Sequence, residues 1–302
     1  MMSDSARLRL ATRASALAMA QSRTVAGAVE RANPGLAVEI VPVTTSGDRI
    51  QDRPLHELGG KGLFTREVEL ALLRGEADIA VHSFKDVPVT MPLVPEAAHA
   101  LVIGAVPARE DPRDVLVSRR GGGVSDLPTG ARIGTSSLRR RAQILALRPD
   151  VEVLALRGNV DTRLARLEAG EMDAMLLAMA GLVRLGRFSP ATMRPLPVDD
   201  MTPAAGQGAL AIQCRRDDAR AAAALAPLDD GPTRRCAEVE RALVAALEGD
   251  CTSPIGALAR ESEPGRFALA GCYERSGRLA RAEATGEAAE VVARVRDALL
   301  AG

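Results

Sequence analysis

Residues 78–88 read Asp-Ile-Ala-Val-His-Ser-Phe-Lys-Asp-Val-Pro, and this stretch decides the fold class. The apolar run Ile79 to Val81 is typical of a buried strand, and Gly75 ends the helix expected before it. Pro88 stops the strand and restricts the preceding residue to extended geometry. A strand that breaks into polar residues in this way indicates an open α/β sheet, in which ligands bind at the carboxyl ends of the strands.

Asp86 is the first candidate for a catalytic residue. We expect it on a stiff loop beside Lys85, where a cation and a carboxylate together can bind an anion and handle a proton. The alternative is a solvated carboxylate that pairs with Lys85, and the local sequence by itself favours that alternative. Other polar stretches of the chain decide between the two interpretations.

Length and composition limit the possible classes of protein. The chain has 302 residues, which is enough for two or three domains, and 47% of them are hydrophobic, as in globular proteins. The formal net charge is zero and there is no Trp, one Tyr and four Phe, so neither a nucleic acid nor a membrane is an expected partner. Neither a signal-peptide core nor a transmembrane run occurs, and the sequence therefore predicts a cytoplasmic protein.

The cysteines do not form a metal or disulfide pattern. They show no C-x-x-C spacing, so no metal site and no disulfide framework is expected. One of them, Cys251, follows Gly249-Asp250 in a loop bounded by Gly and Pro, where a thiol can be exposed. Cys214 in an apolar strand and Cys236 on a helix are expected to pack in the interior.

Strands and helices alternate along most of the chain, which predicts mostly parallel sheets. The first sheet is expected to contain residues 8–10, 38–43, 79–81 and 101–106, with residues 209–213 rejoining it, and helices at 16–32 and 64–74. The second is expected to contain residues 115–118, a strand ending at 134, 151–156 and 174–178. Proline-rich segments at 107–114 and 195–203 are expected crossovers, and the tail contains helices and a hairpin over 267–284.

Two helix starts carry arginines beside capping residues. Ser15 is the expected N-cap of helix 16–32, whose residues Leu17, Ala20, Thr24 and Ala28 have helical spacing, and Arg13 next to it makes an anion site possible. An ordinary cap with a surface arginine is the alternative. In the second case, hydroxyl residues 135–137 precede Arg139 and Arg140, which lie in a first turn where the helix dipole disfavours cations. That pair needs an anion to compensate, unless the helix start is simply solvated.

Further arginines follow the ends of the other predicted strands of the second sheet, namely Arg157, Arg163 and Arg184. Arginine binds carboxylates bidentately, so this set suits a substrate with many carboxylates. The loop Gly59-Gly60-Lys61-Gly62 lacks the spacing of a P-loop, and a lid that carries Lys61 is the better interpretation.

In combination these motifs resemble the porphobilinogen deaminase family, also called hydroxymethylbilane synthases. The resemblance extends from about Leu8 to at least Gly256. It is carried by residues 11–13 (Ala-Thr-Arg), 59–62, 81–88, 134–140 (Gly-Thr-Ser-Ser-Leu-Arg-Arg), 156–159 (Leu-Arg-Gly-Asn), 203–209 and 249–251 (Gly-Asp-Cys). Phe84 stands where Met is common in the family, and the chain ends shortly after Leu300.

The resemblance implies an α/β fold with two periplasmic-binding-protein-like lobes of mostly parallel mixed sheets, plus a small α+β C-terminal domain. Domain 1 would contain residues 1–106 and 200–219, domain 2 residues 107–199, and domain 3 residues 220–302. It also implies a monomer.

The resemblance further implies a transferase of tetrapyrrole (porphyrin and heme) biosynthesis. Such an enzyme joins four porphobilinogen molecules head-to-tail on a dipyrromethane primer, releases ammonia each time, and hydrolyses off hydroxymethylbilane for the next enzyme of the pathway. By position, the primer would be attached through a thioether to Cys251. Asp86 would be the catalytic carboxylate, which helps the amine leave and balances the positive charge that results. The residues that would hold acetate and propionate groups are Arg13, Ser15, Ser83, Lys85, Ser136, Arg139, Arg140, Arg157, Arg163 and Arg184.

Two other classes of function stay open on the residues alone. A non-catalytic anion-binding protein could use the same bilobal scaffold, although the missing signal peptide and the cysteine in a separate domain argue against it. An acyl transferase with a cysteine nucleophile would need a histidine near Cys251. The histidines are His56, His82 and His99, all in the expected first domain.

Overall fold

The computed structural model of the chain describes residues 6–45, 65–89, 100–250 and 253–302. The chain forms two compact units, which are considered separately. The first unit contains residues 1–109 and 209–234, and the second contains residues 110–208 and 235–302. The chain thus passes between the units three times: within the predicted crossover 107–114, after Gly208, which lies a few residues beyond the predicted crossover 195–203, and after Arg234. The division into three domains stays a prediction.

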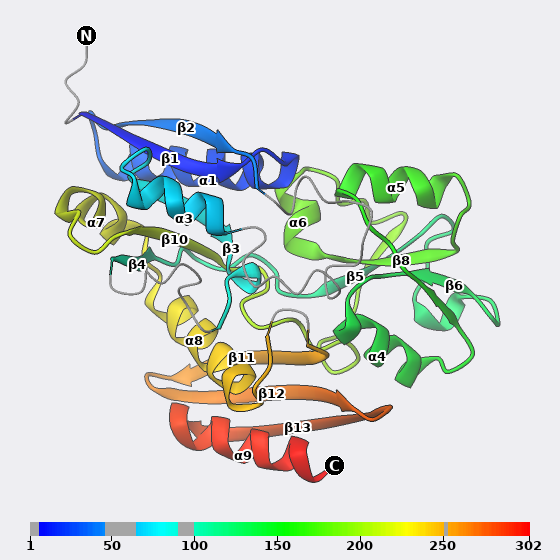
Figure 1. The fold of residues 1–302 in the computed structure, drawn as a ribbon. Helices are drawn as coiled ribbons and strands as arrows, with labels where there is room; N and C mark the ends of the chain where they lie inside the picture. Colours follow the sequence, from blue (N-terminus) through cyan, green and yellow to red (C-terminus); the bar gives the residue numbers. More distant parts are fainter. Residues whose placement is uncertain (1–5, 46–64, 90–99, 251–252) are drawn as a thin grey trace. The chain divides into compact units, whose positions relative to one another are not determined.

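The first unit is built on a five-stranded mixed sheet, shown in Figure 1. In spatial order its strands are β2 (Ala37–Val43), β1 (Arg7–Arg13), β3 (Ile79–Ser83), β10 (Leu210–Arg215) and β4 (Leu101–Ala105). Strand β1 pairs in parallel with β2 and β3, whereas β10 runs antiparallel to β3 and β4. The prediction that residues 209–213 rejoin the first sheet is therefore confirmed.

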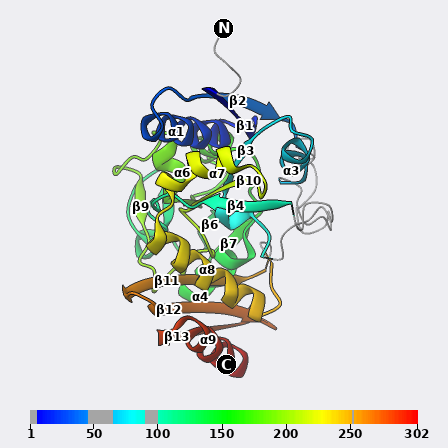
Figure 2. The ribbon, with the colours of Figure 1, turned by 90° about the vertical axis from the view of Figure 1, so that its left-hand side faces the viewer.

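Helices cover both faces of this sheet. Figure 2 shows α1 (Ala16–Ala32) and α7 (Ala219–Leu225) on one side and α3 (Arg66–Leu73) on the other. The predicted helix 16–32 is present as α1, and its buried residues are Gln21, Ser22, Val25, Ala26 and Val29, whereas Thr24 is exposed. The physical reason is that Val25 and Val29 lie one turn apart and bury more apolar surface than Thr24 and Ala28 can.

The second unit repeats this strand order. Its sheet contains β7 (Glu152–Leu154), β6 (Arg132–Gly134), β8 (Ala174–Ala178), β5 (Asp114–Ser118) and β9 (Met193–Pro195). Strand β6 is parallel to β7 and β8, and β5 is antiparallel to β8 and β9, just as β10 is in the first unit. Ile144 of α4 (Leu138–Leu147) packs on one face, and Leu167 of α5 (Val160–Glu168) and Leu182 of α6 (Met179–Arg184) pack on the other.

The tail of the second unit is a three-stranded antiparallel sheet with helices on it. It contains β11 (Ile255–Glu263), β12 (Arg266–Arg275), β13 (Arg278–Glu287), the helix α9 (Ala288–Ala301) and, from residue 235 on, the helix α8 (Gly231–Ala246). The predicted hairpin is β12–β13, whereas β11 was not predicted. Both helices approach β12 so closely at Gly271 that an added Cβ atom would lie 2.9 Å from atoms of Leu243 and Val295.

The predicted α/β fold class is confirmed: two α/β lobes with mixed, mostly parallel sheets of the same strand order, and a small α+β C-terminal part. The repeated strand order places the carboxyl ends of the three parallel strands of each lobe at one edge of its sheet. Within the described residues, no helix is long and apolar enough to cross a membrane.

Candidate active site

Asp86 lies directly beyond the carboxyl end of β3, in a single 3₁₀ turn over Phe84–Asp86. The turn is closed by the Val87 amide, which donates to the Phe84 carbonyl at 3.2 Å, and the Phe84 amide donates to the Ala209 carbonyl at 3.0 Å. Phe84 and Val87 are buried on either side of the exposed Asp86 carboxylate. Val87 has the extended geometry predicted for a residue before proline. The stiff loop inferred from the sequence is therefore present.

The structure is compatible with both interpretations of Asp86, because the carboxylate is exposed and Lys85 precedes it in the same turn. The buried Phe84 and Pro88 flank Asp86, so the backbone of this turn presents the carboxylate at the surface.

Other predicted site residues of the first unit lie at the same edge of its sheet. Arg13 is the last residue of β1, and Ser15 caps α1 by accepting a hydrogen bond from the Ala18 amide at 3.3 Å. The Ser83 hydroxyl, at the end of β3, accepts a hydrogen bond from Nε2 of Gln21 at 2.9 Å. Gln21 was not predicted as a site residue. It lies one helical turn before Val25 and two turns before Val29, and a polar residue on this buried face could have indicated a buried hydrogen bond.

A buried polar chain lies next to this edge, on the face of the sheet covered by α3. Nε2 of His82 lies 3.2 Å from Oε1 of Gln213, whose Nε2 donates to Oε1 of Glu69 at 3.4 Å. Burial, together with the positive charge of Arg13, lowers the pKa of His82 to about 4, although the Gln213 hydrogen bond opposes this shift. Burial raises the pKa of Glu69. His82 is therefore a neutral, structural histidine near pH 7.

In the second unit, Ser136 and Ser137 have different roles. Ser137 is the N-cap of α4, and its hydroxyl lies 3.4 Å from the Arg140 amide. The Ser136 hydroxyl donates to the Leu156 carbonyl at 2.9 Å and accepts from the Leu156 amide at 3.0 Å. Ser136 thus joins the end of β6 to the segment that carries Arg157.

Arg139 and Arg140 are buried, so the solvated helix start considered above is wrong. The compensating anion that their position requires is Asp114, a fully buried residue at the start of β5. Arg139 Nη1 donates to Asp114 Oδ2 at 2.6 Å, and Arg140 Nη2 donates to Asp114 Oδ1 at 2.7 Å. Burial raises the pKa of Asp114, but the two guanidinium groups outweigh this effect and hold it well below its usual range. The sequence did not identify Asp114 as the partner of the two arginines, because it is one of several charged residues of alternating sign in segment 109–114.

Arg140, Arg157 and Arg163, here called the arginine cluster, gather positive charge in the second unit. Burial, followed by the repulsion of Arg140 and Arg157, lowers the pKa of Arg163 to about 10. Arg163 Nε donates to the Gly158 carbonyl at 2.8 Å. Nη1 of Arg157 is buried and has no hydrogen-bond partner among the described residues. A buried donor without an acceptor, beside two further cations, fits a carboxylate ligand.

Arg184 lies elsewhere in the second unit, at the end of α6. Its Nη2 donates to the Gly208 carbonyl at 2.7 Å, and burial lowers its pKa while the Glu110 carboxylate raises it. The Arg184 side chain therefore contacts Gly208, the last residue before the chain leaves the second unit.

Lys61 and Cys251 lie outside the described residues. On either side of residues 251 and 252, the Ser253 amide donates to the Asp250 carbonyl at 3.2 Å and the Asp250 amide donates to the Ser253 hydroxyl at 2.9 Å. Cys214 is fully buried, as predicted, and Cys236 is partly buried. No group of described residues could hold a metal ion.

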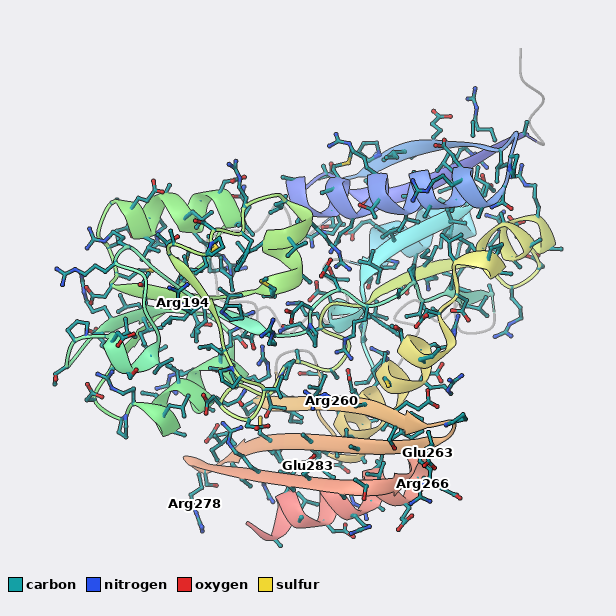
Figure 3. The ribbon with its side chains drawn as sticks, turned by 180° about the vertical axis from the view of Figure 1, so that it is seen from behind. Arg194, Arg260, Glu263, Arg266, Arg278 and Glu283 are labelled. Atoms are coloured by element: carbon teal, nitrogen blue, oxygen red, sulfur yellow. The ribbon has the colours of Figure 1, made fainter. Side chains whose placement is uncertain are left out.

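Many arginines of the chain have no part in these clusters. Figure 3 labels six exposed charged residues on β9 and the tail sheet: Arg194, Arg260, Glu263, Arg266, Arg278 and Glu283. The excess of arginine over lysine in the sequence therefore does not tell how many arginines belong to the site.

Comparison with known proteins decides the family. The sequence profile described as "Porphobilinogen deaminase, dipyromethane cofactor binding domain" matches residues 8–223. The chain belongs to the porphobilinogen deaminase family. A porphobilinogen deaminase of Xanthomonas oryzae pv. oryzae is 51% identical over 282 residues, which cover 93% of this chain and 90% of that protein. One of Syntrophobacter fumaroxidans is 51% identical over 249 residues, covering 82% and 78%.

Similarity to solved structures is weaker. A putative methionine-binding lipoprotein of Bacillus subtilis is 14% identical and aligns over 76% of this chain and 93% of its own, with a TM-score of 0.44. A similarity of this size carries no argument about function.

The residues present fit the cofactor named in the family profile. A dipyrromethane bears several carboxylates, and the arginine cluster offers Arg163 and the unpartnered Nη1 of Arg157. The predicted roles of individual residues toward this cofactor stay predictions.

Proposed function

We propose that the chain performs its family's reaction with Asp86 as the catalytic carboxylate and Cys251 as the attachment point of the primer. The chain is a deaminating transferase of tetrapyrrole biosynthesis that polymerises porphobilinogen into hydroxymethylbilane on a dipyrromethane cofactor. In each addition the bond between the aminomethyl carbon and its amine breaks, and a carbon–carbon bond to a pyrrole forms. The pyrrole loses one proton, and ammonia leaves. After four additions, water releases the linear product.

The arginine cluster is the observation that carries this proposal. The partly buried Arg157 and Arg163 lie near Arg140, whose charge is paired with Asp114, and burial together with Arg140 and Arg157 lowers the pKa of Arg163 to about 10. A protein that only needed stability would not keep this repulsion, because like charges at close range are destabilising. Acetate and propionate groups of bound pyrroles would neutralise the cluster and accept from Nη1 of Arg157.

Asp86 is suited to the proton transfers. An exposed carboxylate on a rigid turn can carry a proton to the departing amine and then, as an anion, stabilise the positive charge left on the substrate. Arg13, Ser15, Ser83 and Lys85 at the same sheet edge would bind substrate carboxylates. In this proposal Gln21 fixes the hydroxyl of Ser83.

The thiol of Cys251 would form the thioether to the primer. When bound, the dipyrromethane supplies the pyrrole end to which the first porphobilinogen is joined. Arg139, Arg140, Arg157 and Arg163 would bind its carboxylates, and Ser136 would keep Arg157 in register with them. Arg184 and the Lys61 loop complete the proposed set.

The proposal includes the setting of the reaction. The chain would act as a cytoplasmic monomer without nucleic-acid or membrane partners, and it would pass hydroxymethylbilane to the next enzyme of the tetrapyrrole pathway. The zero net charge supports the absence of nucleic-acid and membrane partners.

Ammonia release tests the proposal against the alternative of a non-catalytic binding protein. The purified protein is incubated with porphobilinogen, and ammonia, remaining porphobilinogen and linear tetrapyrrole are measured together. We expect four ammonia molecules for each hydroxymethylbilane. Binding of porphobilinogen without release of ammonia, in protein that carries the primer, would contradict the proposal.

A further inference from the structure

We propose that Asp114 is a positioning residue of the reaction, which acts through Arg139 and Arg140. It holds both guanidinium groups in the orientation in which Arg139 can bind a carboxylate through two nitrogen atoms. This inference rests on the proposed function, because that function assigns carboxylate binding to the arginine pair.

Asp114 receives hydrogen bonds from two arginines and a glutamine. Its side chain is completely inaccessible to solvent. Oδ2 accepts from Arg139 Nη1 at 2.6 Å, while Oδ1 accepts from Arg140 Nε at 2.9 Å and Nη2 at 2.7 Å. Nε2 of Gln207 donates to the same Oδ1 at 3.0 Å. The carboxylate is therefore fixed by its own partners and cannot turn away from the arginines.

The two arginines are held by further bonds. Nη1 of Arg139 also donates to the Thr202 carbonyl at 2.6 Å, and Nη1 of Arg140 donates to the Leu176 carbonyl at 3.0 Å. Each guanidinium plane is thus fixed by the carboxylate on one side and a backbone carbonyl on the other. All three nitrogen atoms of the Arg140 guanidinium make hydrogen bonds in this way.

Arg139 differs from Arg140 in the number of its guanidinium nitrogen atoms that make hydrogen bonds. Among the described residues, no acceptor contacts its Nε or Nη2, since both of its side-chain hydrogen bonds use Nη1. Nε and Nη2 form the edge of a guanidinium that matches the two oxygens of a carboxylate. The contacts made by Asp114 and Thr202 therefore present this edge of Arg139 for a ligand.

Charge and orientation give opposite predictions for the loss of Asp114. If the carboxylate only partly neutralised the arginines, its removal would make the site more positive and would tighten the binding of anionic substrate. If it positions them, its removal lets both guanidinium groups turn toward other acceptors, and binding weakens. Asp114→Asn keeps the size of the side chain and removes the charge, so it separates the two effects.

Asp78 provides a matched control in the first unit. It is 3% exposed, and it accepts from the Arg9 amide at 2.8 Å and from Arg9 Nη2 at 3.0 Å. Arg215 and Arg220 lie near the same carboxylate. Asp78 precedes β3 at the amino end of the strand, and its arginine partners are not among the proposed site residues. Asp78→Asn therefore removes a buried carboxylate from arginines without changing the proposed site.

The experiment compares wild-type, Asp114→Asn and Asp78→Asn proteins, all primer-loaded, at a temperature at which circular dichroism shows each to be folded. The readouts are KM and kcat for porphobilinogen and the intact masses of chains stalled with partly grown product. We expect Asp114→Asn to raise KM about tenfold or more, as for the loss of a charge-assisted bidentate contact, and to accumulate stalled masses. We expect Asp78→Asn to stay within about twofold of wild type in both constants.

Two results would overturn the inference: kinetics of Asp114→Asn that equal those of Asp78→Asn, or a lowered KM. If Asp114→Asn does not fold, Asp114→Glu keeps the charge and moves it by one methylene, and wild-type KM in that variant would equally overturn the inference. A primer-loaded wild-type protein without ammonia release would instead remove the proposed function itself.

Discussion

The charged Arg163 side chain should lower the free energy of unfolding of the primer-free protein. Replacing Arg163 with Gln should therefore make the primer-free protein more stable. Burial and the charges of Arg140 and Arg157 lower the pKa of Arg163 to about 10, more than two units below the ordinary pKa of arginine. One pKa unit corresponds to about 1.4 kcal/mol, so the charged side chain carries a penalty of about 3 kcal/mol in the folded state. Because the folded-state pKa is the lower one, the penalty is fully present at every pH below about 10.

The substitution also removes a favourable contact. Arg163 Nε donates to the Gly158 carbonyl at 2.8 Å, and the loss of such a bond costs about 1 kcal/mol. The net expectation is a gain of about 1–2 kcal/mol in the free energy of unfolding of Arg163→Gln, since a neutral side chain ends the repulsion. In the loaded enzyme the same substitution should weaken turnover, because one of the proposed carboxylate partners is gone.

The assay is urea unfolding followed by circular dichroism in a Cys251→Ser background, in which no primer can attach and neutralise the cluster. Arg166→Gln is the control, because Arg166 lies on the same helix in a largely exposed ion pair with Glu171 at 2.7 Å. The control should change stability by about 0.5 kcal/mol or less. If the free energy of unfolding of Arg163→Gln is lower than that of the control variant, repulsion within the arginine cluster does not destabilise the protein, and the prediction is refuted.

Two further outcomes are expected. Burial lowers the pKa of His82 to about 4, below its ordinary 6.5, so only the unfolded chain gains a proton there and stability should fall as the pH drops from about 6.5 to about 4. His82→Gln should flatten that part of the stability curve, and an unchanged slope would contradict this assignment. Asp86→Ala should fold and keep the primer mass but turn over porphobilinogen about a hundredfold or more slowly, and near-normal kinetics would remove Asp86 from the mechanism.

Local patterns in the sequence were sufficient for much of the fold. The apolar run before Pro88 predicted both β3 and the turn that presents Asp86, because a proline fixes the geometry of its own and the preceding residue. Ser15, Ser137 and Asn159 all cap helices, as short polar residues before periodic segments should. Alternating strands and helices indicated two lobes.

Partners distant in the sequence could not be predicted in the same way. Asp114 and Arg139 are 25 residues apart, and Gln21 and Ser83 are 62 apart. Helical spacing tells which face a residue occupies, but it does not tell which residue of another strand or helix faces it. The sequence showed that Arg139 and Arg140 need an anion, and only the fold identifies Asp114 as one that they have. Helix α1 was predicted with its observed bounds, but only the fold shows that Val25 and Val29 are among its buried residues.

The intact mass of the purified protein, measured beside a Cys251→Ser variant, tests the central claim most directly. The account predicts a wild-type mass that exceeds the bare chain by one dipyrromethane, and a variant with the bare mass. A bare wild-type mass that porphobilinogen or hydroxymethylbilane cannot raise, with no activity regained, would contradict the account. An excess mass retained in the variant would place the primer on a residue other than Cys251.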